Sequence, residues 1–165
     1  MLNLPFPAID LHTQRTVLLG VGNELQADDA AGLLVIRALT ARLGSSPVVL
    51  LLEGGVAPEN FTGKIRKFAP KRVIIVDAAD MDAEAGVVDW VGLDQIDGFS
   101  ASSHIMPLSV LAKFLSEDMG CLVNVIGIQA QTLEMGEAVS LPVQKAAHQL
   151  AEGLARLICG EEPDG

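Results

Sequence analysis

The chain has 165 residues, half of them hydrophobic, which is enough to bury the core of one compact domain and excludes disorder over most of its length. It carries 21 acidic against 11 basic residues, for a net charge of −10, so nucleic acid and anionic membrane surfaces are excluded as expected partners. Cys121 and Cys159 lie far apart, without a Cys or His at ligand spacing, and are expected to be reduced thiols.

The N-terminal stretch has neither the basic start nor the continuous apolar run of a signal peptide. No apolar run approaches the ~20 residues needed to span a bilayer. We therefore expect a cytoplasmic protein. A single domain is predicted over residues 1–165, with a loose N-terminal arm at 1–14, the core at 16–158 and an acidic tail at 159–165.

The first predicted elements are a strand and a helix. TVLLGV, residues 16–21, is an unbroken apolar run, which is typical of a strand buried on both faces. The sequence then passes through GVGNELQADDAAG, residues 20–32, into a helix that Gly44 ends. The apolar stripe of this helix comprises Ala31, Leu34, Val35, Ala38 and Leu39.

The remaining elements alternate in the same way. Three further apolar runs predict strands at 48–53, 72–78 and 121–128, and the weaker GVVDWV predicts an edge strand at 86–91. Helices are expected from Pro58 to Pro70, from Met106 to Met119, and after Ser140 and Pro142. This alternation predicts an α/β fold, a three-layer sandwich with a mostly parallel twisted sheet of about five strands and helices on both faces.

The loop after the first strand opens like a phosphate-binding loop, because Gly20 and Gly22 match the first two glycines of G-x-G-x-x-G. Leu25 occupies the third position, however, and two acids stand at the helix start where a pyrophosphate would need free N–H groups. A dinucleotide site is therefore disfavoured. Capping of the helix could explain Asp28. One helix start does not need two acids for capping, so Asp29 is the stronger candidate for a functional residue.

Other polar residues follow the predicted strands, at the edge where ligands bind in an open parallel sheet. Glu53 ends the second strand, Asp77 the third with Asp80 soon after, and Gln129 follows the last; His104 lies in the loop SASSHIMP. A carboxylate at a strand end can simply accept N–H bonds from its loop. Two carboxylates and an imidazole at one crevice could also bind zinc, nickel or cadmium, or perform acid–base chemistry without a metal.

Four segments resemble the nickel–iron hydrogenase maturation proteases in order and spacing: GVGNELQADDAAG, EGGVAPEN, VDAADM and SSHIMPL. The resemblance covers residues 16 to 158 and looks like the branch that serves formate-hydrogenlyase-type hydrogenases. It implies an endopeptidase that removes the C-terminal extension of the hydrogenase large subunit precursor after nickel insertion. The metal-contacting and catalytic positions of the family match Asp29, Asp77 and His104.

The resemblance also implies that nickel arrives with the substrate, and zinc or cadmium could substitute for it in vitro. Whether the nickel is only recognised or also acts as a Lewis acid stays open at this point. The free protein is expected to be a monomer. Residues expected to support the three metal-contacting positions are Asn23, Asp28, Glu53 and Asp80, of which Glu53 stands where many relatives have aspartate.

Two other functions remain open from the sequence. A non-catalytic, chaperone-like module could sense the metal and bind the nickel-loaded large subunit, since no nucleophile is obvious and no serine lies in a strand-to-helix elbow. A nucleotide-handling enzyme is disfavoured by the acidic crevice. A basic cluster around one helix end could be a docking patch or a solvated surface; it comprises Lys64, Arg66, Lys67, Lys71 and Arg72.

Overall fold

A five-stranded sheet forms the centre of the computed structural model, which describes residues 9–99 and 106–161. Its strands are β1 (Thr16–Val21), β2 (Val49–Gly55), β3 (Arg72–Ala79), β4 (Val88–Val91) and β5 (Leu122–Gln129). Their order is β2-β1-β3-β5-β4. Strands β2, β1, β3 and β5 pair in parallel. Strand β4 lies at the edge, as its weaker hydrophobic pattern predicted, and pairs antiparallel with β5.

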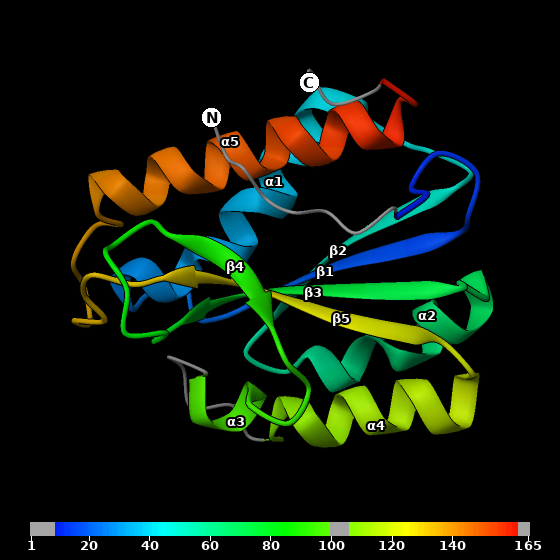
Figure 1. Cartoon of the computed structure of the whole chain (residues 1–165), viewed down its shortest axis with the longest axis horizontal. Coiled ribbons are helices and arrows are strands. Elements are labelled where there is room, and N and C mark those ends of the chain that lie inside the picture. Colours follow the sequence, from blue (N-terminus) through cyan, green and yellow to red (C-terminus); the bar gives the residue numbers. More distant parts are fainter. Residues whose placement is uncertain (1–8, 100–105, 162–165) are drawn as a thin grey trace.

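Helices cover both faces of the sheet (Figure 1). The helical elements are η1 (Ala27–Ala30), α1 (Ala31–Leu43), η2 (Pro58–Phe61), α2 (Thr62–Phe68), α3 (Ile96–Phe99), α4 (Leu108–Met119) and α5 (Leu141–Ile158), where η marks a 3-10 helix. The helices α1 and α5 pack together on one face, and α2, α3 and α4 lie on the other (Figure 1). The predicted three-layer α/β sandwich is confirmed.

Most residues of the central strands are apolar because helices bury both faces of the sheet. Along β3, Ile74 and Val76 pack into the cluster under α1 and α5, whereas Val73 and Ile75 pack into the cluster under α2 and α4. Side chains of a strand alternate between faces, so Asp77 shares the face of Ile75. The fold therefore directs this carboxylate toward the layer of α3 and α4.

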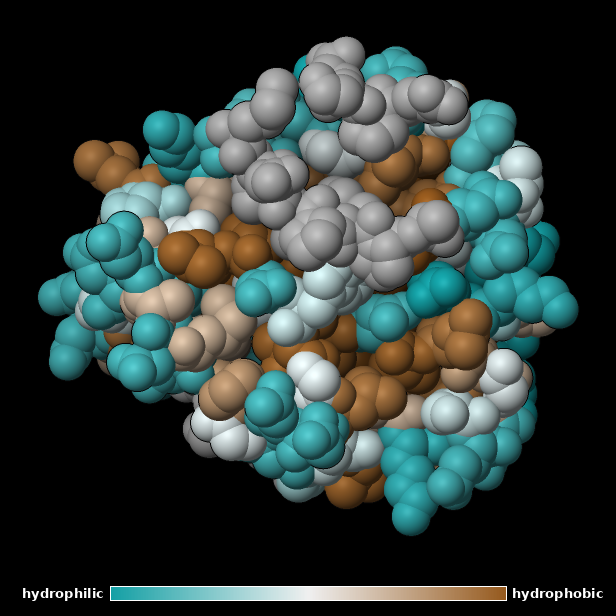
Figure 2. All heavy atoms as spheres, viewed as in Figure 1, coloured by the Kyte–Doolittle hydropathy of each residue, from teal (hydrophilic) through white to brown (hydrophobic). Residues whose placement is uncertain are grey.

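The edge strand β4 leaves hydrophobic residues partly exposed to solvent. Val88 and Trp90 are half-buried and pair with Ile128 and Ile126 of β5. Figure 2 shows hydrophilic residues along most of the outline of this face and hydrophobic residues near its middle, where Figure 1 places β4 and β5. Within the described residues, no helix has the length and hydrophobicity needed to cross a membrane.

Candidate functional site

Glycines bring the start of α1 into backbone contact with the sheet. A Cβ on Gly32 would lie 2.1 Å from the carbonyl oxygen of Val76, and one on Gly20 would lie 2.4 Å from the carbonyl oxygen of Gly32. Gly22 has φ +134°, and its Cβ would lie 1.9 Å from the carbonyl oxygen of Asp29. Gly20, Gly22 and Gly32 therefore allow close packing of the backbone, and this packing holds η1 at the carboxyl ends of β1 and β3.

Asp29 is buried in η1, with 1% of its surface exposed. Its Oδ2 accepts a hydrogen bond of 2.8 Å from the backbone N–H of Asn23. Because η1 contacts β3, this carboxylate lies at the carboxyl edge of the sheet, where the sequence predicted it. The bond from Asn23 fixes the orientation of the carboxylate.

Asp77 is also buried, with 3% of its surface exposed. It lies in β3 opposite Gly127 of β5. The pocket beside it is small and mostly apolar, and its wall includes Ile96, Phe99 and Leu108. The structure thus places Asp77 at the carboxyl end of the sheet, facing α3 and the beginning of α4.

His104 lies outside the described residues. The described chain ends at Phe99 and resumes at Met106, and both Phe99 and Leu108 border the pocket next to Asp77. In residues 9–99 and 106–161, no three His, Cys, Asp or Glu side chains are grouped closely enough to bind a metal ion. The described part of the candidate site consequently consists of the two buried carboxylates.

Asp28 binds the loop between β5 and α5. It is fully buried, and its Oδ2 accepts hydrogen bonds from the N–H groups of Gln131 (2.8 Å) and Thr132 (3.1 Å) and from the hydroxyl of Ser140 (2.8 Å). Oδ1 accepts a fourth bond from the Ser140 N–H, at 2.7 Å. Asp28 lies in the first turn of η1, where an acid is favoured, and these four hydrogen bonds join it to the loop before α5.

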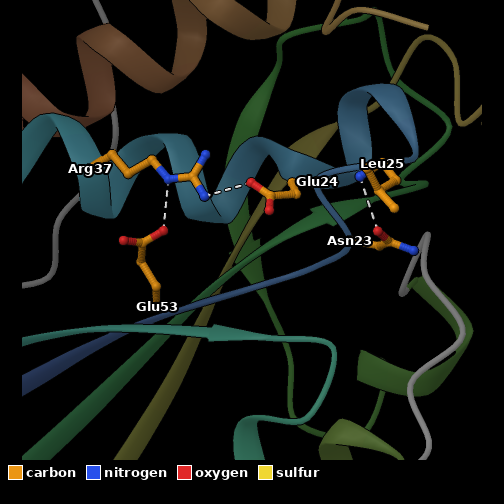
Figure 3. Close-up of polar contacts among 5 residues, drawn as sticks. All are labelled: Asn23, Glu24, Leu25, Arg37 and Glu53. Atoms are coloured by element: carbon orange, nitrogen blue, oxygen red, sulfur yellow. Dashed lines mark hydrogen bonds and ion pairs between the residues drawn. The ribbon is translucent and has the colours of Figure 1, made fainter. Parts of the chain in front are cut away.

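Glu53 contacts a cation on the neighbouring helix. Its Oε1 lies 2.7 Å from Nε of Arg37, whose Nη2 lies 2.7 Å from Oε2 of Glu24 (Figure 3). Hydrogen bonds to Glu24 and Glu53 raise the pKa of the Arg37 guanidinium above its ordinary value. This bridge, which is about half exposed to solvent, ties the loop after β1 to the end of β2.

Asp80 and Gln129 brace the loop after β3. The Gln129 side chain is buried; its Oε1 accepts a hydrogen bond of 2.6 Å from the N–H of Met81, and its Nε2 donates to Oδ1 of Asp80 at 3.4 Å. Asp80 itself is exposed. Among the predicted supporting residues, Asn23 bonds directly to Asp29. Asp28, Glu53 and Asp80 contact Ser140, Arg37 and Gln129, respectively.

Sequence analysis missed Arg37 and Ser140. Arg37 and Arg42 are the only basic residues between positions 16 and 63, which could have marked Arg37 as a partner for the acids around it. Ser140 gives no such signal, because its bond with Asp28 spans 112 residues of sequence. The basic cluster lies at the opposite end of the sheet, since it surrounds the end of α2 and the first residue of β3.

Comparison with known proteins identifies the family. The family described as hydrogenase maturation protease, HycI, matches residues 33–161. Hydrogenase 3 maturation protease of Escherichia coli K12 is 35% identical over 139 residues, which cover 84% of this chain and 87% of the relative.

Solved structures of related proteins support the same family. The crystal structure of the NiFe hydrogenase maturation protease HycI from Thermococcus kodakarensis KOD1 has a TM-score of 0.80 at 34% identity, covering 88% of this chain and 93% of that one. The solution structure of the endopeptidase HycI from Escherichia coli has a TM-score of 0.75 at 34% identity, covering 86% and 89%. The four motifs, the fold and the relatives agree, and the chain belongs to the hydrogenase maturation protease family of peptidases.

Proposed function

We propose that the protein is the endopeptidase that removes the C-terminal extension of a nickel-loaded NiFe hydrogenase large subunit precursor. Its family and its HycI relatives support the reaction class. The single observation that supports the nickel-dependent form of this function is the pair of buried carboxylates, Asp29 and Asp77, at the carboxyl edge of the sheet. Burial of carboxylates is costly unless charge or hydrogen bonds compensate for it, and a divalent cation supplies such charge.

The donor atoms suit nickel chemically. Asp29 and Asp77 offer carboxylate oxygens, and His104 adds an imidazole nitrogen by its match to the family motif. Such N/O sets bind borderline divalent cations, so zinc or cadmium should substitute for nickel in vitro. The hydrogen bond from Asn23 to Asp29 is the kind of outer contact that orients a metal-binding carboxylate.

In this proposal nickel belongs to the substrate. Asp29, Asp77 and His104 contact the metal that is already inserted in the precursor, and so recognise that maturation has reached this stage. By holding the metal they hold the polypeptide around it, which places the peptide bond to be cut at the edge of the sheet. Such positioning by itself lowers the barrier to the reaction.

Intact-mass spectrometry of the precursor tests the proposal. We expect loss of a C-terminal peptide when the nickel-loaded precursor is incubated with the protein, and no loss from the nickel-free precursor. Equal cleavage of both precursors would contradict the role of nickel. A nickel-loaded precursor that binds and stays whole would favour the chaperone-like alternative.

A further inference from the structure

Two large apolar side chains are exposed beside the candidate site. Leu25, in the loop after β1, is 64% exposed, and Met135, in the loop after β5, is 62% exposed. The two loops touch, because the N–H of Gly136 donates a hydrogen bond of 2.8 Å to the carbonyl oxygen of Leu25. Both loops follow the carboxyl ends of parallel strands, so these side chains lie on the same edge of the sheet as the buried carboxylates.

The loop after β2 adds a third apolar side chain. Val56 is exposed, and the carbonyl oxygen of Gly55 before it accepts a hydrogen bond of 2.9 Å from the N–H of Gly22. The loop that holds Leu25 thus contacts the loop after β2 on one side and the loop after β5 on the other. We call Leu25, Val56 and Met135 the apolar rim.

Contacts within the protein hold the turn under Leu25. Oδ1 of Asn23 accepts a hydrogen bond of 3.0 Å from the N–H of Leu25, and Glu24 is held by Arg37 (Figure 3). The N–H of Asn23 in turn bonds to Asp29. A large apolar side chain on a fixed backbone loses little conformational freedom on binding and is suited to anchor a partner. The same turn positions both Leu25 and Asp29.

We infer that the apolar rim docks the substrate polypeptide, through an apolar segment of the large subunit precursor that carries basic residues and lies beside the bond to be cut. This inference rests on the proposed function. Continuity with the site argues for the substrate as the occupant, since Leu25 is four residues before Asp29. Charge argues for basic residues in that segment, because exposed Glu134 and Glu137 flank Met135 and the whole chain carries a net charge of −10.

The test measures the affinity of the full-length protein for the immobilised nickel-loaded precursor. Leu25→Ser and Met135→Ser should each weaken binding about five- to thirtyfold, since each removes a large apolar contact. Leu25→Met keeps the apolar surface and should stay within about twofold of the unaltered protein. Leu122→Ser is the matched control: Leu122 is 58% exposed but begins β5, at the opposite end of the sheet. Binding should weaken as salt is added.

Thermal unfolding of each variant shows whether a loss of affinity is a loss of fold. Unchanged affinity in Leu25→Ser and Met135→Ser would overturn the inference, and so would equal weakening in Leu122→Ser. Binding that does not respond to salt would overturn the basic character of the segment. Cleavage is followed in the same samples. A precursor whose binding depends on Leu25 but which stays whole would contradict the peptidase function alone. Efficient cleavage, with affinity unchanged in Leu25→Ser and Met135→Ser, would contradict the docking surface alone.

Discussion

The backbone N–H of Asn23 donates a hydrogen bond of 2.8 Å to Oδ2 of Asp29, and this bond closes the turn between β1 and the 3-10 helix. The preceding acid, Asp28, has a different task, because its carboxylate binds Ser140 and the loop after β5. Of these two adjacent aspartates, Asp28 therefore has a structural role and Asp29 is the candidate for metal contact. Asp28 fastens a distant loop, and Asp29 remains at the strand edge beside β3.

Replacement of Gly22 by alanine should damage both fold and site. The residue has φ +134°, and a Cβ would lie 1.9 Å from the carbonyl oxygen of Asp29, so the backbone at Asp29 must move. We expect Gly22→Ala to lower the free energy of unfolding by more than about 3 kcal/mol, measured by urea denaturation. Gly63→Ala is the control: this glycine lies in α2 with nothing within 4 Å of its Cβ, and alanine there should stabilise by about 0.5–1 kcal/mol. Equal stability of the two variants would refute this account.

Removal of the Asp28 carboxylate should destabilise the loop after β5. Asp28→Ala leaves the N–H groups of Gln131, Thr132 and Ser140 without their acceptor, at an expected cost of about 3–5 kcal/mol in the free energy of unfolding. Asp118→Ala, which removes an exposed carboxylate 3.9 Å from Arg66, should change it by less than about 0.5 kcal/mol. Hydrogen exchange should show the loss of protection at those three amides. Retained protection would mean that Asp28 does not hold the loop.

The Arg37 bridge should matter more for activity than for stability. Exposed ion pairs contribute about 0.2–1 kcal/mol each, so Arg37→Ala should cost little in unfolding. By loosening the turn that positions Asp29, it should slow precursor cleavage about two- to fivefold, the equivalent of about 0.5–1 kcal/mol in the barrier. Arg42→Ala is the matched control on the same helix, where Arg42 lies 3.6 Å from Glu152. A similar loss of rate in both variants would rule out the role of the bridge.

The two thiols should differ in reactivity. Cys121 is buried, and burial raises the pKa of its thiol, so less of the nucleophilic thiolate is present at any given pH. Cys159 is exposed. Near pH 8, iodoacetamide should modify Cys159 and spare Cys121 until the protein is unfolded in urea, as shown by peptide mass spectrometry. The Cys159→Ser variant should stay unlabelled while folded; rapid labelling of that variant would show that Cys121 is accessible.

Most of the fold could be predicted because a strand that is buried on both faces appears in the sequence as an unbroken apolar run. The apolar run at 16–21 is β1, and its neighbours in the sheet begin or end within two residues of the predicted limits. The strand β2 was predicted to end at residue 53, where the apolar run ends. It continues to Gly55: Gly20 pairs with Glu53 and Val21 with Gly55, so the register shifts by one residue at Gly54. The short 3-10 helices gave no periodic signal.

The candidate site was predictable only where its residues come from strand ends. Asp29 and Asp77 lie at the expected edge because parallel strands bring their carboxyl ends together. The contacts of Asp28 with Ser140 and of Glu53 with Arg37 depend on loop geometry and on side-chain reach, which a sequence pattern does not contain. Sequence spacing could therefore place the acids at one edge but could not assign their individual partners.

The most direct test of the central claim is the extent of cleavage of the nickel-loaded precursor by variants of the acids at this edge, measured by intact-mass spectrometry. Asp29→Asn, Asp77→Asn and His104→Ala should each abolish or severely slow removal of the C-terminal peptide while the protein stays folded. Asp118→Asn changes an exposed carboxylate at the opposite end of the sheet and should cleave like the unaltered protein. Undiminished cleavage by Asp29→Asn and Asp77→Asn would contradict the role assigned to the two buried carboxylates.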